Sequence, residues 1–251
     1  MKITKGMKMK EISILFILFL VTITIDAQNT FEKDTINTEK GKLVITFIGH
    51  GTLIIEAENK TIHIDPVGMY ADYSKMPKAD LILITHHHGD HFDTAAINNI
   101  LKNGTRVIGT KICSVNYPNI SVLENGDIEI FSDFLIEAVP AYNIVHKRDD
   151  GNYFHPKGEG NGYVINVSGK RIYIAGDTEN VPEMKNLNNI DIAFLPMNLP
   201  YTMSPEMVAN AVELFNPKIL YPYHFGKTDV NILIDLLKSK NECEVRIRKM
   251  E

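Results

Sequence analysis

The sequence predicts a layered α/β fold, and three features of the chain indicate it. Short runs of aliphatic and β-branched residues recur between turn residues over positions 42–249, which is typical of strands. Segments with helix-capping signals, such as 93–102 and 204–216, follow strands in both halves of the chain. The run Leu81–Ile84 is wholly apolar, as expected for a central strand. Helices in both halves could cover both faces of the sheet structure, which produces layers.

The predicted elements begin with a meander of three strands, because turn residues at 49–51 and 58–60 separate three short apolar runs. In chain order, strands are expected at Leu43–Ile48, Leu53–Glu56, Thr61–Ile64, Leu81–Ile84, Arg106–Ile108, Asp127–Ile130, Phe134–Val139, Gly162–Val167, Arg171–Ala175, Asp191–Leu195, Lys218–Tyr223 and Glu244–Lys249. Helices are expected from the Asp93 cap to Lys102, from Ser204 to just before Pro217, and over Asp229–Lys238.

The composition is that of an ordinary globular protein of 251 residues, with 44% hydrophobic and 23% charged residues. These proportions exclude a wholly disordered chain and a collagen. The net charge of -5 does not support binding to nucleic acid, which needs a basic face. The 9 histidines are the feature that such a composition leaves unexplained.

The N-terminal residues have the pattern of a signal peptide. Several lysines precede the uncharged run Ile12–Ile25, and the small residue Ala27 lies just beyond it. Residues 1–27 are therefore expected to direct the chain to the periplasm or out of the cell. The run is short for a membrane span of about 20 residues, so membrane anchoring is expected only if the signal stays uncleaved. Residues 28–41 are polar and aperiodic and predict a tether, which leaves 42–251 as one domain.

Residues 85–91, with the sequence THHHGDH, directly follow the apolar strand. Imidazole and carboxylate are ligands of borderline divalent metals, and this density of histidine is hard to explain as structure alone. Alternate side chains of an extended segment share a side, so His86 and His88 can hold one ion. Asp90 and His91 then point elsewhere and can reach a second ion. The segment therefore predicts a metal site at the end of this strand.

The pattern H-x-H-x-D-H after an apolar strand resembles the signature of the metallo-β-lactamase superfamily of dinuclear metal hydrolases. Two segments after later strands resemble further ligand motifs of that superfamily, Gly176-Asp177-Thr178 and Pro222-Tyr223-His224-Phe225-Gly226. Residues 195–197 and 203–206 are similar to the branch that contains ascorbate-6-phosphate lactonases and N-acylphosphatidylethanolamine phospholipases D. The resemblance covers residues 42–228 and implies a four-layer αββα sandwich with the metals at one edge.

The resemblance also implies two bound divalent ions, expected to be Zn²⁺, with Mn²⁺ or Fe²⁺ as alternatives. It assigns His86 and His88 to the first ion, and Asp90, His91 and His224 to the second, with Asp177 bridging the two. Taken alone, Asp177 could equally be a turn residue after glycine, and His224 a partly buried histidine at an aromatic strand end. Together with residues 85–91, the ligand interpretation is favoured for both.

The first ion departs from the family pattern at its third ligand. In the related branch a histidine follows Pro-Ala-x, whereas here Pro140-Ala141-Tyr142 is followed by Asn143. Asparagine is a weak oxygen ligand and cannot closely replace imidazole. His146 and His155 could supply the missing nitrogen, and His155 is favoured as a ligand or substrate contact because its segment resembles family members that share the asparagine. A surface-loop role stays open for both. His50 could hydrogen-bond a metal ligand, but a structural role as a turn residue is expected.

Two divalent ions held about 3.5–4 Å apart can share a hydroxide and clamp the oxygens of the attacked group. Asp90 is the expected catalytic residue, which orients this hydroxide and passes a proton to the leaving group. The sequence has no G-x-S-x-G, P-loop or dinucleotide motif that would indicate another chemistry. It therefore predicts a hydrolase that uses a metal-bound hydroxide on an ester, phosphodiester or lactone.

The substrate is expected to be a small or lipid-like molecule, and the sequence singles out no substrate-binding residue. Four basic residues could favour an anionic substrate or simply belong to a solvated surface: Lys147, Arg148, Lys157 and Lys170. The alternative from another class is a non-catalytic periplasmic protein that binds and sequesters metal. An intact second site, with Asp90 as its base, favours the enzyme.

Overall fold

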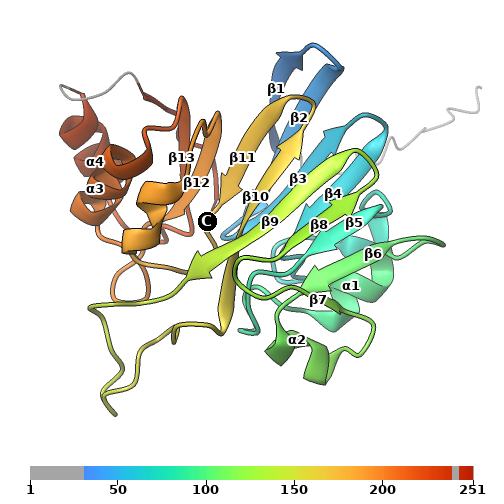
Figure 1. The fold of residues 1–251 in the computed structure, drawn as a ribbon, viewed down its shortest axis with the longest axis horizontal. Coiled ribbons are helices and arrows are strands. Elements are labelled where there is room, and N and C mark those ends of the chain that lie inside the picture. The colour runs from blue at the N-terminus through green and yellow to red at the C-terminus, as the bar shows by residue number, and fades with distance from the viewer. Residues whose placement is uncertain (1–30, 239–242, 251) are drawn as a thin grey trace, which may run out of the picture. The chain divides into compact units, whose positions relative to one another are not determined.

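Two seven-stranded sheets lie face to face in the computed structural model, which describes residues 31–238 and 243–250 (Figure 1). In spatial order, the first sheet contains β1 (Glu32–Thr38), β2 (Gly41–Gly49), β3 (Thr52–Ala57), β4 (Lys60–Ile64), β5 (Leu81–Leu83), β6 (Arg106–Gly109) and β7 (Ser121–Val122). The second contains β14 (Glu244–Val245), β13 (Ile219–Tyr223), β12 (Ile192–Pro196), β11 (Lys170–Ile174), β10 (Gly160–Val167), β9 (Phe134–Ala141) and β8 (Ile128–Phe131).

Each sheet begins as an antiparallel meander and continues as parallel strands. In the first sheet the pairs from β1 to β4 are antiparallel and those from β4 to β7 are parallel. The second sheet repeats this order, with antiparallel pairs from β8 to β11 and parallel pairs from β11 to β14. The central parallel strands β5 and β12 are short and fully buried, as predicted for Leu81–Ile84, because both of their faces are covered.

Aromatic side chains from both sheets form the centre of the core. The ring of Phe47 on β2 lies 5.1 Å from that of Tyr221 on β13, and Phe194 on β12 stacks on Tyr221 at 5.1 Å. All three side chains are buried, and rings of this size contribute much of the apolar area that leaves water on folding. The inner faces of the two sheets therefore pack directly on each other.

Helices cover the outer faces. On the first sheet, α1 (Thr94–Ile100) begins at Asp93, whose carboxylate caps two amides of the first turn, and Ile97 packs in one apolar cluster with Ile82 of β5. The short α2 (Lys111–Asn116) lies near the same sheet, and α3 (Pro205–Phe215) and α4 (Val230–Leu237) lie beside β12 and β13 (Figure 1). Short 3₁₀ helices span Tyr73–Lys75 and Pro182–Asn186. The predicted αββα sandwich is thereby confirmed.

The tether expected over residues 28–41 is wrong for the part that the structure describes. Glu32–Thr38 form β1, which pairs with β2 along its whole length. The carboxylate of Asp34 accepts hydrogen bonds of 2.7–3.0 Å from the guanidinium of Arg248 and so ties this strand to the C-terminal segment. This edge strand is held by backbone pairing and polar contacts, so it does not need an apolar face. Its sequence therefore lacks the apolar alternation from which a strand is predicted.

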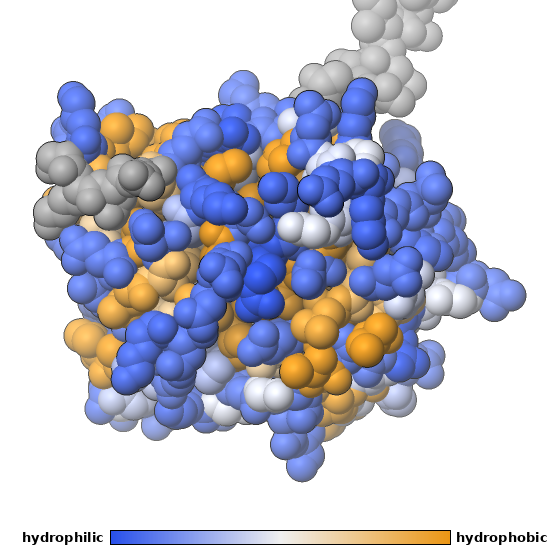
Figure 2. Space-filling model, turned by 45° about the horizontal axis from the view of Figure 1, so that its top comes forward, coloured by the Kyte–Doolittle hydropathy of each residue, from blue (hydrophilic) through white to orange (hydrophobic). Residues whose placement is uncertain are grey.

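The structure differs from the prediction in two further elements. The last strand, expected over Glu244–Lys249, pairs only at Glu244–Val245, and the helix Lys111–Asn116 was not predicted. The expected signal peptide, residues 1–27, lies outside the described residues. Within the described ranges no helix is long and apolar enough to cross a membrane. The face seen in Figure 2 is mainly hydrophilic with small separate hydrophobic patches, which is normal for a protein surface.

His63 on β4 is fully buried and leads to a prediction on acid stability. Burial lowers its pKa to about 4, although a 3.0 Å hydrogen bond to the Pro77 carbonyl opposes the shift. In the unfolded chain this imidazole takes up a proton near pH 6.5, whereas in the folded chain it stays neutral down to about pH 4. The stabilisation by neutral His63 is therefore complete above pH 6.5. As the pH falls toward 4, the free energy of unfolding decreases by about 3 kcal/mol.

The His63→Gln variant keeps a donor for Pro77 and removes the titration. Urea unfolding at several pH values should therefore show a smaller loss of stability between pH 6.5 and 4 than in the wild-type chain. An identical pH slope in the two proteins would contradict the assignment.

Candidate metal centre

The predicted site residues lie where strands of both sheets end. β5 leads into residues 85–91, where the amides of His91 and Phe92 both donate to the His88 carbonyl, at 3.0 and 2.9 Å. This turn reverses the chain and sends successive side chains to different sides. Carboxyl ends of neighbouring parallel strands share one edge of a sheet, so the segments after β11 and β13 reach the same place. The structure brings together His86, His88, Asp90, His91, His155, Asp177 and His224.

The first group consists of three histidines. Ligand atoms of His86, His88 and His155 all lie within 4.8 Å of one another. Burial and the neighbouring His155 and His87 lower the pKa of His88 to about 4. Burial also holds the pKa of His86 well below its usual value. Both rings are therefore neutral at pH 7, which is the form in which imidazole binds a metal.

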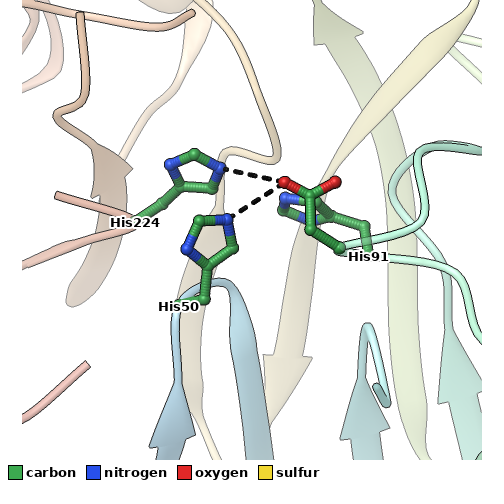
Figure 3. A group of neighbouring side chains, drawn as sticks. His50, His91 and His224 are labelled. Carbon is green, nitrogen blue, oxygen red and sulfur yellow. Dashed lines mark hydrogen bonds and ion pairs between the residues drawn. The ribbon is translucent and has the colours of Figure 1, made fainter. Parts of the chain in front are cut away.

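The second group contains His50, Asp90, His91 and His224, whose ligand atoms also lie within 4.8 Å of one another. Figure 3 shows three imidazole rings turned toward one carboxylate. Oδ2 of Asp90 lies 3.2 Å from Nε2 of His50 and 3.9 Å from Nε2 of His224. His50 was expected to be a turn residue, with a hydrogen bond to a metal ligand as the alternative. It does occupy the β2–β3 turn, with φ of 53°, but its ring enters this group.

Asp177 lies between the two groups. Its Oδ2 is 3.2 Å from Nε2 of His155 and 3.3 Å from Nε2 of His224, and its Oδ1 is 3.4 Å from Nε2 of His91. Burial raises the pKa of this carboxyl, but the nearby His224 and His91 outweigh the effect and hold it well below its usual range. Asp177 is therefore ionised and buried, and it faces nitrogen atoms from both sets.

The donor atoms suit metal ions because several of them have no other partner. Among the described residues, five buried atoms in this cluster have no hydrogen-bond partner: Nε2 of His86 and His91, both ring nitrogens of His224, and Oδ1 of Asp177. A buried polar atom without a partner costs free energy, so such a concentration of donor atoms fits a bound cation. The electrostatics agree. Burial lowers the pKa of His91, but Asp177 and Asp65 outweigh this and raise it to about 9, as expected where positive charge is favoured.

Asp65 is a site residue that the sequence analysis missed. It follows β4 and is fully buried, and its carboxylate takes hydrogen bonds from the Thr85 amide at 2.7 Å and from the Thr85 hydroxyl at 2.6 Å. Its Oδ2 also lies 2.8 Å from Nδ1 of His91. A carboxylate on Nδ1 fixes the tautomer, so the Nε2 atom faces the site as a free ligand. The available signal was an aspartate at the end of an apolar strand next to the predicted site.

The Asn143 position, where the sequence departs from the family pattern, is explained by its contacts. The side chain is buried, and its Oδ1 lies 2.8 Å from both the amide nitrogen and Nδ1 of His155. Asn143 therefore orients the His155 ring, whose Nε2 faces Asp177. His146 instead has its Nδ1 2.6 Å from Oε1 of Glu179, away from the first group. The geometry thus places His155, and not His146, beside His86 and His88.

An open cleft of about 440 Å³ lies over the two groups and Asp177, which are together called the metal-ligand groups below. Four other residues also line it, namely Arg148, Phe154, Asn198 and Tyr201. Of the side chain of Asp90, 44% is exposed, in contrast to the buried Asp177. A small molecule in this cleft could therefore meet Asp90 and the metal-ligand groups at once.

A family model described as the β-lactamase superfamily domain matches residues 44–224 of the chain, which include every residue of the cluster. The chain belongs to the metallo-β-lactamase superfamily. A UPF0173 metal-dependent hydrolase from Thermococcus onnurineus is 35% identical over 196 residues, which span 72% of this chain and 84% of the relative. One from a Geobacillus strain is 34% identical over 193 residues, with 72% and 85% covered. This superfamily member is therefore a metal-dependent hydrolase.

Solved structures agree with this family. A crystal structure from Parabacteroides distasonis, provisionally named a metal-dependent hydrolase, has 48% sequence identity and a TM-score of 0.84, covering 88% of this chain and 100% of that one. A metallo hydrolase from Ignicoccus hospitalis has 25% identity and a TM-score of 0.69, covering 83% of this chain and 95% of that one. The metallo-β-lactamase sandwich therefore spans nearly all of the described chain.

Proposed function

We propose that this hydrolase is dinuclear and zinc-dependent and acts on an ester, phosphodiester or lactone. The observation that carries the proposal is the position of Asp177, whose two oxygens face nitrogen atoms of both groups. A carboxylate shared by two ligand sets suits a pair of ions. Zinc is favoured because the donors are imidazoles and carboxylates, and Mn²⁺ and Fe²⁺ accept the same donors.

In this proposal His86, His88 and His155 hold the first ion, Asp90, His91 and His224 hold the second, and Asp177 is a ligand of both. The partners behind the ligands support the assignment. Asn143 occupies Nδ1 of His155, and Asp65 occupies Nδ1 of His91, so both rings present Nε2. His50 bonds Oδ2 of Asp90, and we assign it to the orientation of that carboxylate.

When bound, divalent ions lower the pKa of a water molecule and polarise the attacked oxygen. The chain supplies the proton transfers through Asp90. Burial raises the pKa of this carboxyl, but the hydrogen bond to His50 and the charge of His91 outweigh it and keep the pKa below its usual range. Asp90 is therefore ionised at neutral pH and can accept a proton from water and deliver it to the leaving-group oxygen.

The proposal extends to location and substrate size. The cleft of about 440 Å³ is of the size that takes small ligands, so we propose a small or lipid-like molecule as the substrate. The signal-peptide pattern of residues 1–27 supports a periplasmic or secreted enzyme.

Elemental mass spectrometry of the chain, purified without chelator, tests the dinuclear assignment. We expect about two zinc ions per chain. The Asp177→Asn variant should retain at most one, because its amide cannot serve both ions as a carboxylate does. As a control, Asp191→Asn changes an aspartate that pairs with Lys218 on the surface, and it should retain both ions. One ion or none in the wild-type chain after zinc, manganese and iron have been supplied would contradict the proposal.

A further inference from the structure

The wall of the cleft includes a tight turn in the segment between β9 and β10. The Arg148 amide donates to the Asn152 carbonyl at 2.7 Å, and the Gly151 amide donates to the Arg148 carbonyl at 3.0 Å. An isolated β-bridge between Lys147 and Tyr153 closes the base of this turn. The backbone of Arg148 is therefore held by its neighbours, and its side chain projects from a fixed point.

The guanidinium of Arg148 is held at the edge of the cleft by an aromatic ring. It lies 4.9 Å from the ring centroid of Phe154, and its Nη2 donates to the Phe154 carbonyl at 3.3 Å. Within residues 31–238 and 243–250 it forms no ion pair with a carboxylate. The pKa of Asp150 in the same turn is lowered mainly by hydrogen bonds from Asn152, and the charge of Arg148 contributes little to this shift. A guanidinium has five N–H donors, so most of those on Arg148 stay free for a ligand.

The charges around the cleft favour an anion. Arg148 is the one lysine or arginine among the described lining residues, and the lining carboxylates, Asp90 and Asp177, both belong to the metal-ligand groups. These two carboxylates cannot neutralise a pair of divalent ions. With both ions bound, the cleft would therefore carry a net positive charge. Arg148 adds a further positive charge to its wall.

An apolar surface adjoins the guanidinium. The rings of Phe154 and Tyr201 meet edge to face at 5.1 Å, and 46% of Tyr201 is exposed. Both residues line the cleft beside Arg148. A ligand in this cleft that reaches Arg148 would thus also meet aromatic carbon beside the guanidinium.

We propose that Arg148 is a specificity-determining residue that binds an anionic group of the substrate. The substrate class is then an ester or phosphodiester that carries an anionic oxygen beside an apolar or aromatic part. The proposal rests on the proposed function, because the scissile bond must lie at the metal-ligand groups. It adds the contact that selects among the esters open to such an enzyme.

The experiment uses the zinc-loaded enzyme and two pairs of chromogenic substrates that differ in charge. The first pair is 4-nitrophenyl hydrogen succinate and neutral 4-nitrophenyl butyrate. The second is bis(4-nitrophenyl) phosphate and its neutral methyl triester. We expect Arg148→Gln to lower kcat/KM about 10- to 100-fold for the anionic member of a pair and less than about threefold for the neutral one. Arg148→Lys should restore part of the loss.

Lys147→Gln is the matched control. The Lys147 ammonium lies over the Tyr153 ring at 4.7 Å and does not line the cleft. Its removal changes the net charge equally and should leave the preference for the anionic member unchanged. Thermal unfolding of all variants shows whether the fold is retained.

The pairs distinguish the source of the anionic group. An effect within the succinate pair alone indicates a carboxylate next to the scissile bond, whereas an effect within the phosphate pair alone indicates the oxygen of a phosphodiester. Equal losses for charged and neutral members would overturn the role of Arg148 and leave the proposed hydrolase intact.

A binding measurement keeps the two proposals separate if no probe is turned over. Isothermal titration of benzylphosphonate into the zinc-loaded wild-type and Arg148→Gln proteins needs no hydrolysis. A Kd raised about tenfold or more in the variant supports the anion contact even if the proposed reaction is wrong. An unchanged Kd overturns it.

Discussion

Replacing Asp90 by asparagine should lower kcat by about 10²- to 10⁴-fold, the range expected when a positioned acid–base group is lost. The amide has nearly the same shape and keeps an oxygen that can accept the bond from His50, which lies 3.2 Å from Oδ2. It cannot take up a proton from water near neutral pH. The chemical step should therefore slow much more than substrate binding weakens, so that kcat falls while KM changes little.

The measurement is steady-state kinetics on a substrate that the wild-type enzyme turns over, with the metal content of each protein determined in parallel. Asp93→Asn is the control, since Asp93 lies three positions further along and caps α1 outside the cluster. Asparagine also caps a helix, but it cannot accept both the first-turn amides and the Gly68 amide, which Oδ2 accepts at 2.9 Å. This variant should therefore keep kcat with only a small loss of stability. If Asp90→Asn kept wild-type kcat with a full metal complement, the proposed role of Asp90 would be wrong.

Replacing Glu179 by glutamine should destabilise the chain by about 2–4 kcal/mol, because the substituted amide cannot satisfy the donors around this buried carboxylate. Oε2 of Glu179 accepts the amides of Ile144 and Val145 at 2.7 and 2.6 Å, and Oε1 accepts the amide of His146 at 2.8 Å. Burial raises the pKa of this carboxyl, but these bonds and one from Asn143 outweigh it and hold the pKa low. In the Glu179→Gln variant, the side-chain NH₂ group would face backbone N–H groups that now donate to a carboxylate oxygen.

The consequence should reach the metal centre. Asn143 donates to Glu179 at 3.1 Å and also orients His155, so release of this segment should loosen a proposed ligand. We expect hydrogen exchange to speed up over residues 143–155 and metal affinity to fall by about 10- to 100-fold. Glu183→Gln is the control, since this carboxylate is partly exposed and contacts Lys157 and the Tyr142 hydroxyl. Its ion pair is worth at most about 1 kcal/mol. Unchanged stability and exchange in Glu179→Gln would contradict this account.

The αββα sandwich and the main ligand motifs could be predicted because both are local patterns. The apolar run Leu81–Ile84 predicts a buried strand by itself, and residues 85–91 must then lie at the edge of the sheet where this strand ends. Asp177 and His224 likewise directly follow predicted strands, and their spacing along the chain matched a family pattern. The strand β1 could not be predicted in this way, because its polar side chains give no alternation and its position depends on pairing with β2.

Contacts between distant segments determined the rest of the site, and no local pattern reports them. Asp65 reaches His91 across 26 positions, and Glu179 reaches Asn143 across 36. The same is true of His50, which a turn between two glycines brings beside Asp90 from 40 positions away. The chain alone established which residue types could bind metal, because ligand chemistry belongs to the side chain. The resemblance already favoured His155 over His146, but the folded structure showed which ring lies beside His86 and His88. It also placed Arg148 at the cleft, because orientation depends on which buried donors and acceptors packing brings within hydrogen-bonding distance.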